Sequence, residues 1–247
     1  MKLKILGNLS PYCKGDDNGI SYMVTSPKSS SKIVLDLGYG TSKMFSFPED
    51  FKNMHVFISH LHWDHFAELS ALAYASMVFN NHNLLDEKFT LYIPKGYSDE
   101  MYYFIKDIFE DGFFELVYYD ENDTFEIDGM NVSFQRTLHS VPCFAARITD
   151  GEKTICYTGD SGYSEDLIPF YSDTDILLHD SGFLRENKVH SYHSTAYEAG
   201  LVAKAANAKK LVVTHFWPEI EPWEYVEEAK EAFENVEAAR TGHEFEA

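Results

Sequence analysis

The order of apolar and polar positions along the chain predicts an α/β fold built from many short strands. Short apolar or alternating runs bounded by glycine, proline or aspartate indicate strands at residues 2–6, 20–25, 32–37, 56–58, 90–93, 175–178 and 211–214. Two further stretches, residues 125–132 and 146–157, predict β-hairpins, because each carries an Asp-Gly pair near its centre. We therefore expect tight turns at Asp128-Gly129 and Asp150-Gly151.

Apolar residues recur at helical spacing in three other segments, which we expect to be helices: residues 66–79, 99–109 and 195–206. Beyond residue 217 the chain is rich in glutamate, and Val226, Ala229, Phe233 and Val236 repeat at the same spacing. This pattern predicts a terminal helix with a solvated acidic face. The chain shows no internal repeat or linker, so its 247 residues are expected to form one domain, residues 1–247.

A dense group of polar residues follows the apolar run Val56-Phe57-Ile58. The sequence there is His60-Leu61-His62-Trp63-Asp64-His65. Imidazole nitrogens and carboxylate oxygens are standard zinc ligands, whereas a core strand has no use for them at its end. His60 and His62 lie two apart on extended backbone and point the same way, while Asp64 and His65 follow a turn and can face a second position. The motif therefore suggests two metal ions.

Three later residues of the ligand type also follow predicted strands: His139, Asp160 and His215. Each of them alone would more often be structural, but together with the six-residue motif they indicate a shared metal site. Asp36 also ends a strand, beside two glycines. It is either a plain turn aspartate or an acid that orients the histidine loop.

The formal net charge of −20, from 40 acidic and 20 basic residues, argues against long nucleic acids as partners. A protein that holds RNA or DNA needs a basic groove that releases counterions. No apolar run is long enough to cross a membrane, and the first residues do not resemble a signal peptide. Three cysteines without CxxC spacing are expected to be free thiols, so we expect a cytoplasmic protein.

The order of these motifs resembles the metallo-β-lactamase superfamily over nearly the whole chain. The resemblance implies a four-layer αββα sandwich, in which two mixed β-sheets are flanked by helices. It also implies that His60, His62 and His139 bind one zinc ion. The second ion would be bound by Asp64, His65 and His215, and Asp160 would bridge both. Manganese or iron could occupy the same ligands.

Within the superfamily, the segment from His193 to Gly200 and the strand ending at His215 resemble ribonuclease Z and its small, cyclic-nucleotide-phosphodiesterase-like relatives. The resemblance implies that His193 is the general acid that protonates the leaving oxygen. Asp180 stands where that family has a glutamate, and whether this shorter side chain supports His193 is left open. Only residues 140–159 separate His139 from Asp160, which leaves no room for a transfer-RNA-binding arm.

Charge and resemblance together predict a binuclear zinc-dependent hydrolase of small phosphodiesters, with cyclic nucleotides or short oligonucleotides as substrates. Two zinc ions lower the pKa of water from about 15.7 toward 7, and Asp64 would orient or deprotonate that water. Phe144, Trp63, Tyr163 and Phe216 are candidates for stacking a base, although an aromatic content of 15% favours core packing for any single one of them. Three alternatives stay open: a ribonuclease Z-like RNA-processing endonuclease, a zinc hydrolase of esters, lactones or thioesters, and a non-enzymatic metal-binding module. A homodimer is expected only from the resemblance.

Overall fold

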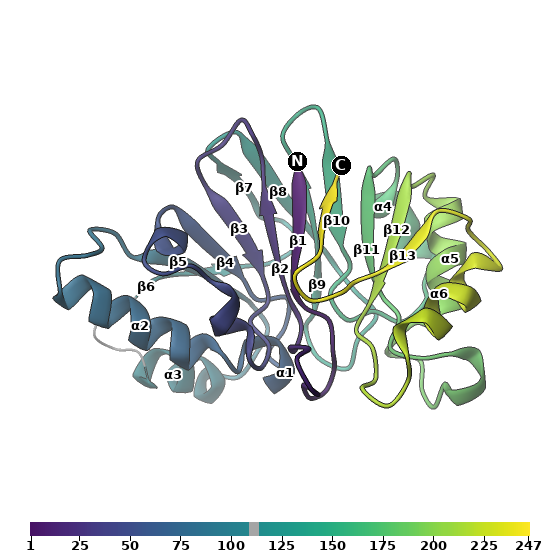
Figure 1. Ribbon diagram of the computed structural model, residues 1–247, viewed down its shortest axis with the longest axis horizontal. Coiled ribbons are helices and arrows are strands. Elements are labelled where there is room, and N and C mark those ends of the chain that lie inside the picture. The colour runs from purple at the N-terminus through teal and green to yellow at the C-terminus, as the bar shows by residue number, and fades with distance from the viewer. Residues whose placement is uncertain (109–113) are drawn as a thin grey trace.

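A computed structural model describes residues 1–108 and 114–247 of the chain. Within these residues, two seven-stranded mixed β-sheets pack face to face, and helices cover the outer face of each sheet (Figure 1). This architecture confirms the predicted four-layer αββα sandwich. The two ends of the chain meet in the first sheet, where the last strand pairs with the first.

The first sheet has the strand order β14-β1-β2-β3-β4-β5-β6. Its strands are β1 (Lys2–Gly7), β2 (Ser21–Thr25), β3 (Lys32–Leu35), β4 (Met54–Phe57), β5 (Phe89–Pro94), β6 (Phe114–Tyr119) and β14 (Glu244–Glu246). The pairs from β14 to β3 are antiparallel, and the pairs from β3 to β6 are parallel. The parallel half of the sheet carries the strand that leads into the histidine-rich motif.

The second sheet has the order β13-β12-β11-β10-β9-β8-β7. Its strands are β7 (Thr124–Ile127), β8 (Met130–Arg136), β9 (Phe144–Thr149), β10 (Thr154–Tyr157), β11 (Ile176–Asp180), β12 (Lys210–Thr214) and β13 (Val236–Ala238). The pairs from β7 to β10 are antiparallel, and those from β10 to β13 are parallel. Both predicted hairpins are present, because β7–β8 turns at Asp128-Gly129 and β9–β10 at residues 150–153.

Helices α1 (Trp63–Phe66), α2 (Leu69–Asn81) and α3 (Asp99–Ile108) lie beside the first sheet, and α4 (Ile168–Tyr171), α5 (Ala196–Ala205) and α6 (Pro222–Lys230) lie beside the second (Figure 1). Short 3₁₀-helices occupy Thr41–Met44, Glu49–Phe51, Glu165–Leu167 and Arg185–Asn187. Among the described residues, no helix combines the length and apolarity needed to cross a membrane.

Alternating side chains of the strands build two separate cores. On β3, Ile33 and Leu35 point between the sheets, whereas Val34 points toward α2 and α3. Leu72 of α2 and Ile105 of α3 complete this second core, and both are buried. Both faces of the first sheet are therefore covered, which explains why its parallel strands are continuous apolar runs.

The predicted helix 66–79 differs from the structure at its start. A short helix ends at Phe66, and α2 begins only at Leu69. The backbone N–H of Glu68 donates to the carbonyl of Leu37, and the Glu68 carboxylate accepts from the backbone N–H groups of Gly40 and Ser42. These hydrogen bonds to the loop after β3 account for the interruption between α1 and α2.

The expected terminal helix is also shorter than its spacing suggested. It ends at Lys230, and Val236 begins strand β13, which pairs with β12. The edge of the second sheet thus overrides the helical periodicity of Val236. The end of the predicted helix 99–109, Phe109, lies outside the described residues, and α3 is described as far as Ile108.

Candidate metal centre

The first group of predicted ligands comes together at the ends of β4 and β8. The Nε2 of His60 lies 3.0 Å from the Nδ1 of His62, which in turn lies 3.2 Å from the Nε2 of His139. Burial holds the pKa of His60 well below its ordinary value, and neighbouring histidines lower it further. The ring is therefore neutral at pH 7 and offers a lone pair, which is the form that binds a metal.

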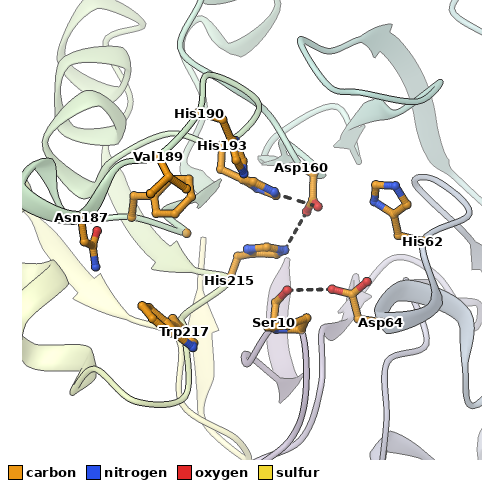
Figure 2. Close-up of a pocket in the computed structure, with 13 residues that line it drawn as sticks. Ser10, His62, Asp64, Asp160, Asn187, Val189, His190, His193, His215 and Trp217 are labelled. Carbon is orange, nitrogen blue, oxygen red and sulfur yellow. Dashed lines mark hydrogen bonds and ion pairs between the residues drawn. The ribbon is translucent and has the colours of Figure 1, made fainter.

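The second group consists of Asp64, His65 and His215, whose candidate ligand atoms all lie within 4.8 Å of one another. Asp64 and His65 lie on α1, and His215 follows β12 in the opposite sheet. His215 has a φ of 67°, in the left-handed region that a histidine seldom adopts. This backbone turn brings its ring back over the edge of the sheet toward Asp160 (Figure 2).

Asp160 lies between the two groups and presents one oxygen to each. Its Oδ2 lies 3.4 Å from His60 Nε2 and 3.7 Å from His139 Nε2. Its Oδ1 lies 3.2 Å from His65 Nε2 and 3.1 Å from His215 Nε2. Burial alone would raise the pKa of Asp160, but the surrounding histidines, His215 first, hold it well below its usual range. The carboxylate is thus ionised and placed as a bridging ligand would be.

Orphaned polar atoms show that this arrangement fits metal ions. The Nε2 of His65, Asp160 Oδ1 and both ring nitrogens of His215 are buried and have no hydrogen-bond partner among residues 1–108 and 114–247. Each buried polar atom without a partner lowers the stability of the fold by about 1–3 kcal/mol. Several such atoms that converge on one point are therefore expected to have a ligand there. A metal cation fits this position, because imidazole nitrogens and carboxylate oxygens are standard metal ligands. All seven predicted ligands therefore lie where they could hold metal.

The outer nitrogens of three ligand histidines are already fixed by the protein. His60 Nδ1 lies 3.0 Å from Ser59 Oγ, and His139 Nδ1 lies 3.1 Å from the carbonyl oxygen of Tyr192. His65 Nδ1 lies 2.8 Å from Asp36 Oδ2. Such contacts orient the rings so that the inner nitrogens face the other predicted ligands.

Asp36 thus turns out to be the acid that orients the histidine loop, the second of the two readings that the sequence left open. It is fully buried and accepts hydrogen bonds from the N–H and hydroxyl of Ser59 and the hydroxyl of Tyr157, besides its contact with His65. Because Tyr157 belongs to the other sheet, this carboxylate also ties the two sheets together at the site.

Replacing Asp36 by asparagine is expected to lower the free energy of unfolding by about 2–4 kcal/mol and to weaken metal binding about 10–100-fold. The amide group would turn a donor toward groups that themselves donate. Chemical denaturation and metal titration measure the two effects. Asp128→Asn is the control, because Asp128 is exposed and accepts its hydrogen bonds from Ser29 and Ser30 in a loop far from the histidines. Unchanged metal affinity in the Asp36 variant would contradict the orienting role.

His193 lies beside the cluster and is paired with Asp180. Its Nδ1 lies 2.8 Å from Asp180 Oδ2, so the shorter aspartate does reach the histidine. The N–H groups of Ser161 and Gly182 donate to the same carboxylate and hold it in place. Burial disfavours a charged ring, but Asp180 and Asp160 outweigh it and raise the pKa of His193 to about 9. The two carboxylates therefore favour the protonated form of His193.

A cavity of about 520 Å³ opens onto the cluster. Besides His62, Asp64, Asp160, His193 and His215, its walls include residues that the sequence did not single out: Ser10, Pro11, Phe183, Asn187, Val189, His190 and Trp217. None of the four aromatic residues named as candidates for stacking a base lines it. Phe144 and Phe216 are buried in the core, in keeping with the core packing that the sequence favoured, and Trp63 packs on Phe66 instead. Loop side chains have no periodicity from which their direction could be predicted.

The fold and this cluster together define a metal-dependent hydrolase. The family model described as the beta-lactamase superfamily domain matches residues 43–216, and the chain belongs to this family. It is 29% identical over 217 residues to the probable metallo-hydrolase YhfI of Bacillus subtilis, covering 87% of this chain and 86% of that protein. It is also 26% identical to a ribonuclease Z of Archaeoglobus fulgidus, covering 83% of this chain and 85% of that enzyme.

Solved structures agree with this assignment. The crystal structure of YhfI, a metallo-beta-lactamase fold protein, superposes with a TM-score of 0.91 at 26% identity and covers 100% of this chain and 99% of that one. The short form of human tRNase Z superposes with a TM-score of 0.76 at 21% identity, covering 100% and 99% of the two chains, and this likeness concerns the fold alone.

Proposed function

We propose that this protein is a binuclear zinc-dependent phosphodiesterase that hydrolyses small phosphodiesters, such as cyclic nucleotides or short oligonucleotides. The observation that carries the proposal is the position of His193, which lines the cavity beside Asp160 and is held at 2.8 Å by the Asp180 carboxylate. A phosphodiester releases an alkoxide, a poor leaving group that needs a proton, and a held imidazolium supplies one. Asp180 favours the charged form of the His193 ring and fixes the orientation of that ring.

His60, His62 and His139 would hold one divalent ion, Asp64, His65 and His215 the other, and Asp160 both. Two such ions acidify water and neutralise charge on phosphoryl oxygens when they are bound. Zinc is the preferred choice for this histidine-rich set, although manganese or iron fits the same donors.

Asp64 has a second role in the proposal, which is to orient or deprotonate the attacking water. Its Oδ2 accepts a hydrogen bond of 2.7 Å from the hydroxyl of Ser10, so one carboxylate oxygen is held in a fixed direction at the cavity wall (Figure 2). Ser10 is thus a positioning residue for Asp64.

The small size of the proposed substrate is supported by what surrounds the cavity. Between His139 and Asp160 the chain forms only a short loop and the β9–β10 hairpin, so no transfer-RNA-binding arm is present there. A net charge of −20 also disfavours a long polyanion. RNA processing is the alternative function, because the chain is similar to a ribonuclease Z. A homodimer is proposed from family membership alone.

Turnover of bis(p-nitrophenyl) phosphate by the zinc- or manganese-loaded protein tests the proposal, with p-nitrophenyl acetate as the ester control. We expect diester hydrolysis that stops on chelation and returns with metal. Ester hydrolysis without any diester hydrolysis would place the substrate outside phosphate chemistry and contradict the proposal.

Replacing Asp180 by asparagine is expected to move the alkaline limb of the kcat profile to lower pH by about 1–2 units. His193 must be protonated to act, and activity falls as pH rises through its pKa. Without the carboxylate the imidazolium loses its partner, the pKa falls, and the proton is lost sooner. Metal content is measured on the same samples, because Asp180 Oδ1 lies 3.6 Å from His215 Nδ1.

Asp175→Asn is the matched control for this prediction, since Asp175 precedes the same strand β11 but pairs with Lys153 and Lys209. Its alkaline limb should not move. An unmoved limb in the Asp180 variant with full metal content would show that Asp180 does not set the protonation of His193.

A further inference from the structure

The half of the cavity that lies away from the metal ligands is apolar. Phe183 and Val189 come from the loop after β11, Trp217 follows β12, and Pro11 comes from the loop after β1. We refer to these four residues as the apolar slot. Figure 2 shows Asn187, Val189 and Trp217 grouped on one side of the histidines, with His62 and Asp64 on the other.

Two side chains of the slot are unusually exposed for their type. Val189 is 78% exposed and Trp217 is 43% exposed. The N–H of Trp217 donates to the hydroxyl of Tyr225, and the Phe183 segment pairs with Thr195. When a ligand covers exposed apolar surface, water is released from that surface and the free energy of binding becomes more favourable. An exposed apolar patch beside a reactive centre is therefore a candidate binding surface.

The slot contains no group that would bind a second phosphate. Within the described ranges, no lysine or arginine lines the cavity. The three cations of the adjoining loops are each engaged elsewhere, because Lys14 pairs with Glu219, Arg185 with Glu231 and Lys188 with Glu198. An additional phosphate placed there would lose its hydration without gaining a lysine or arginine as a cationic partner.

Two polar side chains border the same region. The ring of His190 packs on Phe183, with 5.0 Å between the ring centroids, and Asn187 also lines the cavity. The side-chain oxygen of Asn187 accepts from the N–H of Leu184, which leaves its amide N–H groups without a hydrogen bond among the described residues. These donors suit a ring that carries acceptor atoms. Indole is also the amino-acid side chain with the largest face for stacking on a planar ring.

We infer that the apolar slot binds an uncharged heteroaromatic ring of the substrate, stacked on Trp217, while the metal cluster takes its single phosphate. This inference rests on the proposed function and names the part of the substrate that decides specificity. A diester the size of a mononucleotide carries one ring for the apolar slot and one phosphate for the metal cluster.

Calorimetric titration of the metal-loaded protein with adenosine, a ring without phosphate, tests the slot independently of catalysis. Trp217→Ala is expected to weaken adenosine binding on the order of 10-fold. Trp217→Phe, which keeps an aromatic face, should restore most of the affinity. Trp223→Ala is the matched control, because Trp223 is 59% exposed but lines a different depression, with Glu227 and Glu228. It should bind adenosine like the wild type.

Ribose 5-phosphate, which carries a phosphate but no aromatic base, is the second probe, and its affinity should not depend on Trp217. Adenosine binding that is absent, or equal in wild type and Trp217→Ala, would overturn the inference even if diesters are hydrolysed. An equal loss of ribose 5-phosphate and adenosine binding would also overturn it, since the effect would then be structural. Trp217-dependent adenosine binding without any diester hydrolysis would sustain the slot and refute the proposed function.

Discussion

Replacing His193 by alanine is expected to lower kcat for phosphodiester hydrolysis by about 10²–10⁴-fold and to leave the metal content unchanged. The ring is placed by Asp180 rather than by the predicted ligands, and it carries the proton that the leaving oxygen needs. The loss should be largest for diesters with alkyl leaving groups. It should be smaller for p-nitrophenyl diesters, whose leaving group is stable without a proton.

Steady-state kinetics with one alkyl and one p-nitrophenyl diester measure this difference directly. His243→Ala is a suitable control, because His243 is an exposed histidine outside the cluster and the cavity. Equal losses with both leaving groups, or no loss at all, would show that His193 does not act as the acid.

Replacing Asp160 by asparagine is expected to remove binding at both metal positions, with dissociation constants raised at least about 100-fold. One oxygen faces each group of histidines, so a neutral amide would serve neither ion well. Since metal binding stabilises only the folded state, the metal-loaded variant should melt several degrees below the metal-loaded wild type. Elemental analysis and thermal unfolding, with and without a chelator, measure both effects.

The Asp64→Asn variant is the comparison for Asp160→Asn, because Asp64 is predicted to bind one ion and Asp160 both. Asp64 belongs to the group with His65 and His215, so its replacement should weaken one ion more than the other. If the Asp160 variant kept full activity and unchanged metal content, the bridging assignment would be wrong. If both variants lost the ions equally, the two positions would not be independent.

Much of the fold was predictable, because strands and hairpins follow local patterns. The turns at Asp128 and Asp150 needed only an Asp-Gly pair between apolar runs. Predictions were wrong where distant contacts compete with local periodicity. Glu68 bonds the loop after β3 and delays α2, and Val236 pairs with β12 instead of extending α6.

The sequence by itself determined which chemistry the site can hold, because ligand side chains directly follow apolar strands, and parallel strands bring such positions to one edge of the sheets. His60, Asp160 and His215 belong to this class. Only the tertiary structure decided how Asp36 reaches His65 and Tyr157, how Ser10 holds Asp64, and which aromatic residue faces the cavity. These contacts join loops far apart in the chain, and the direction of a loop side chain depends on its neighbours in space rather than on local sequence.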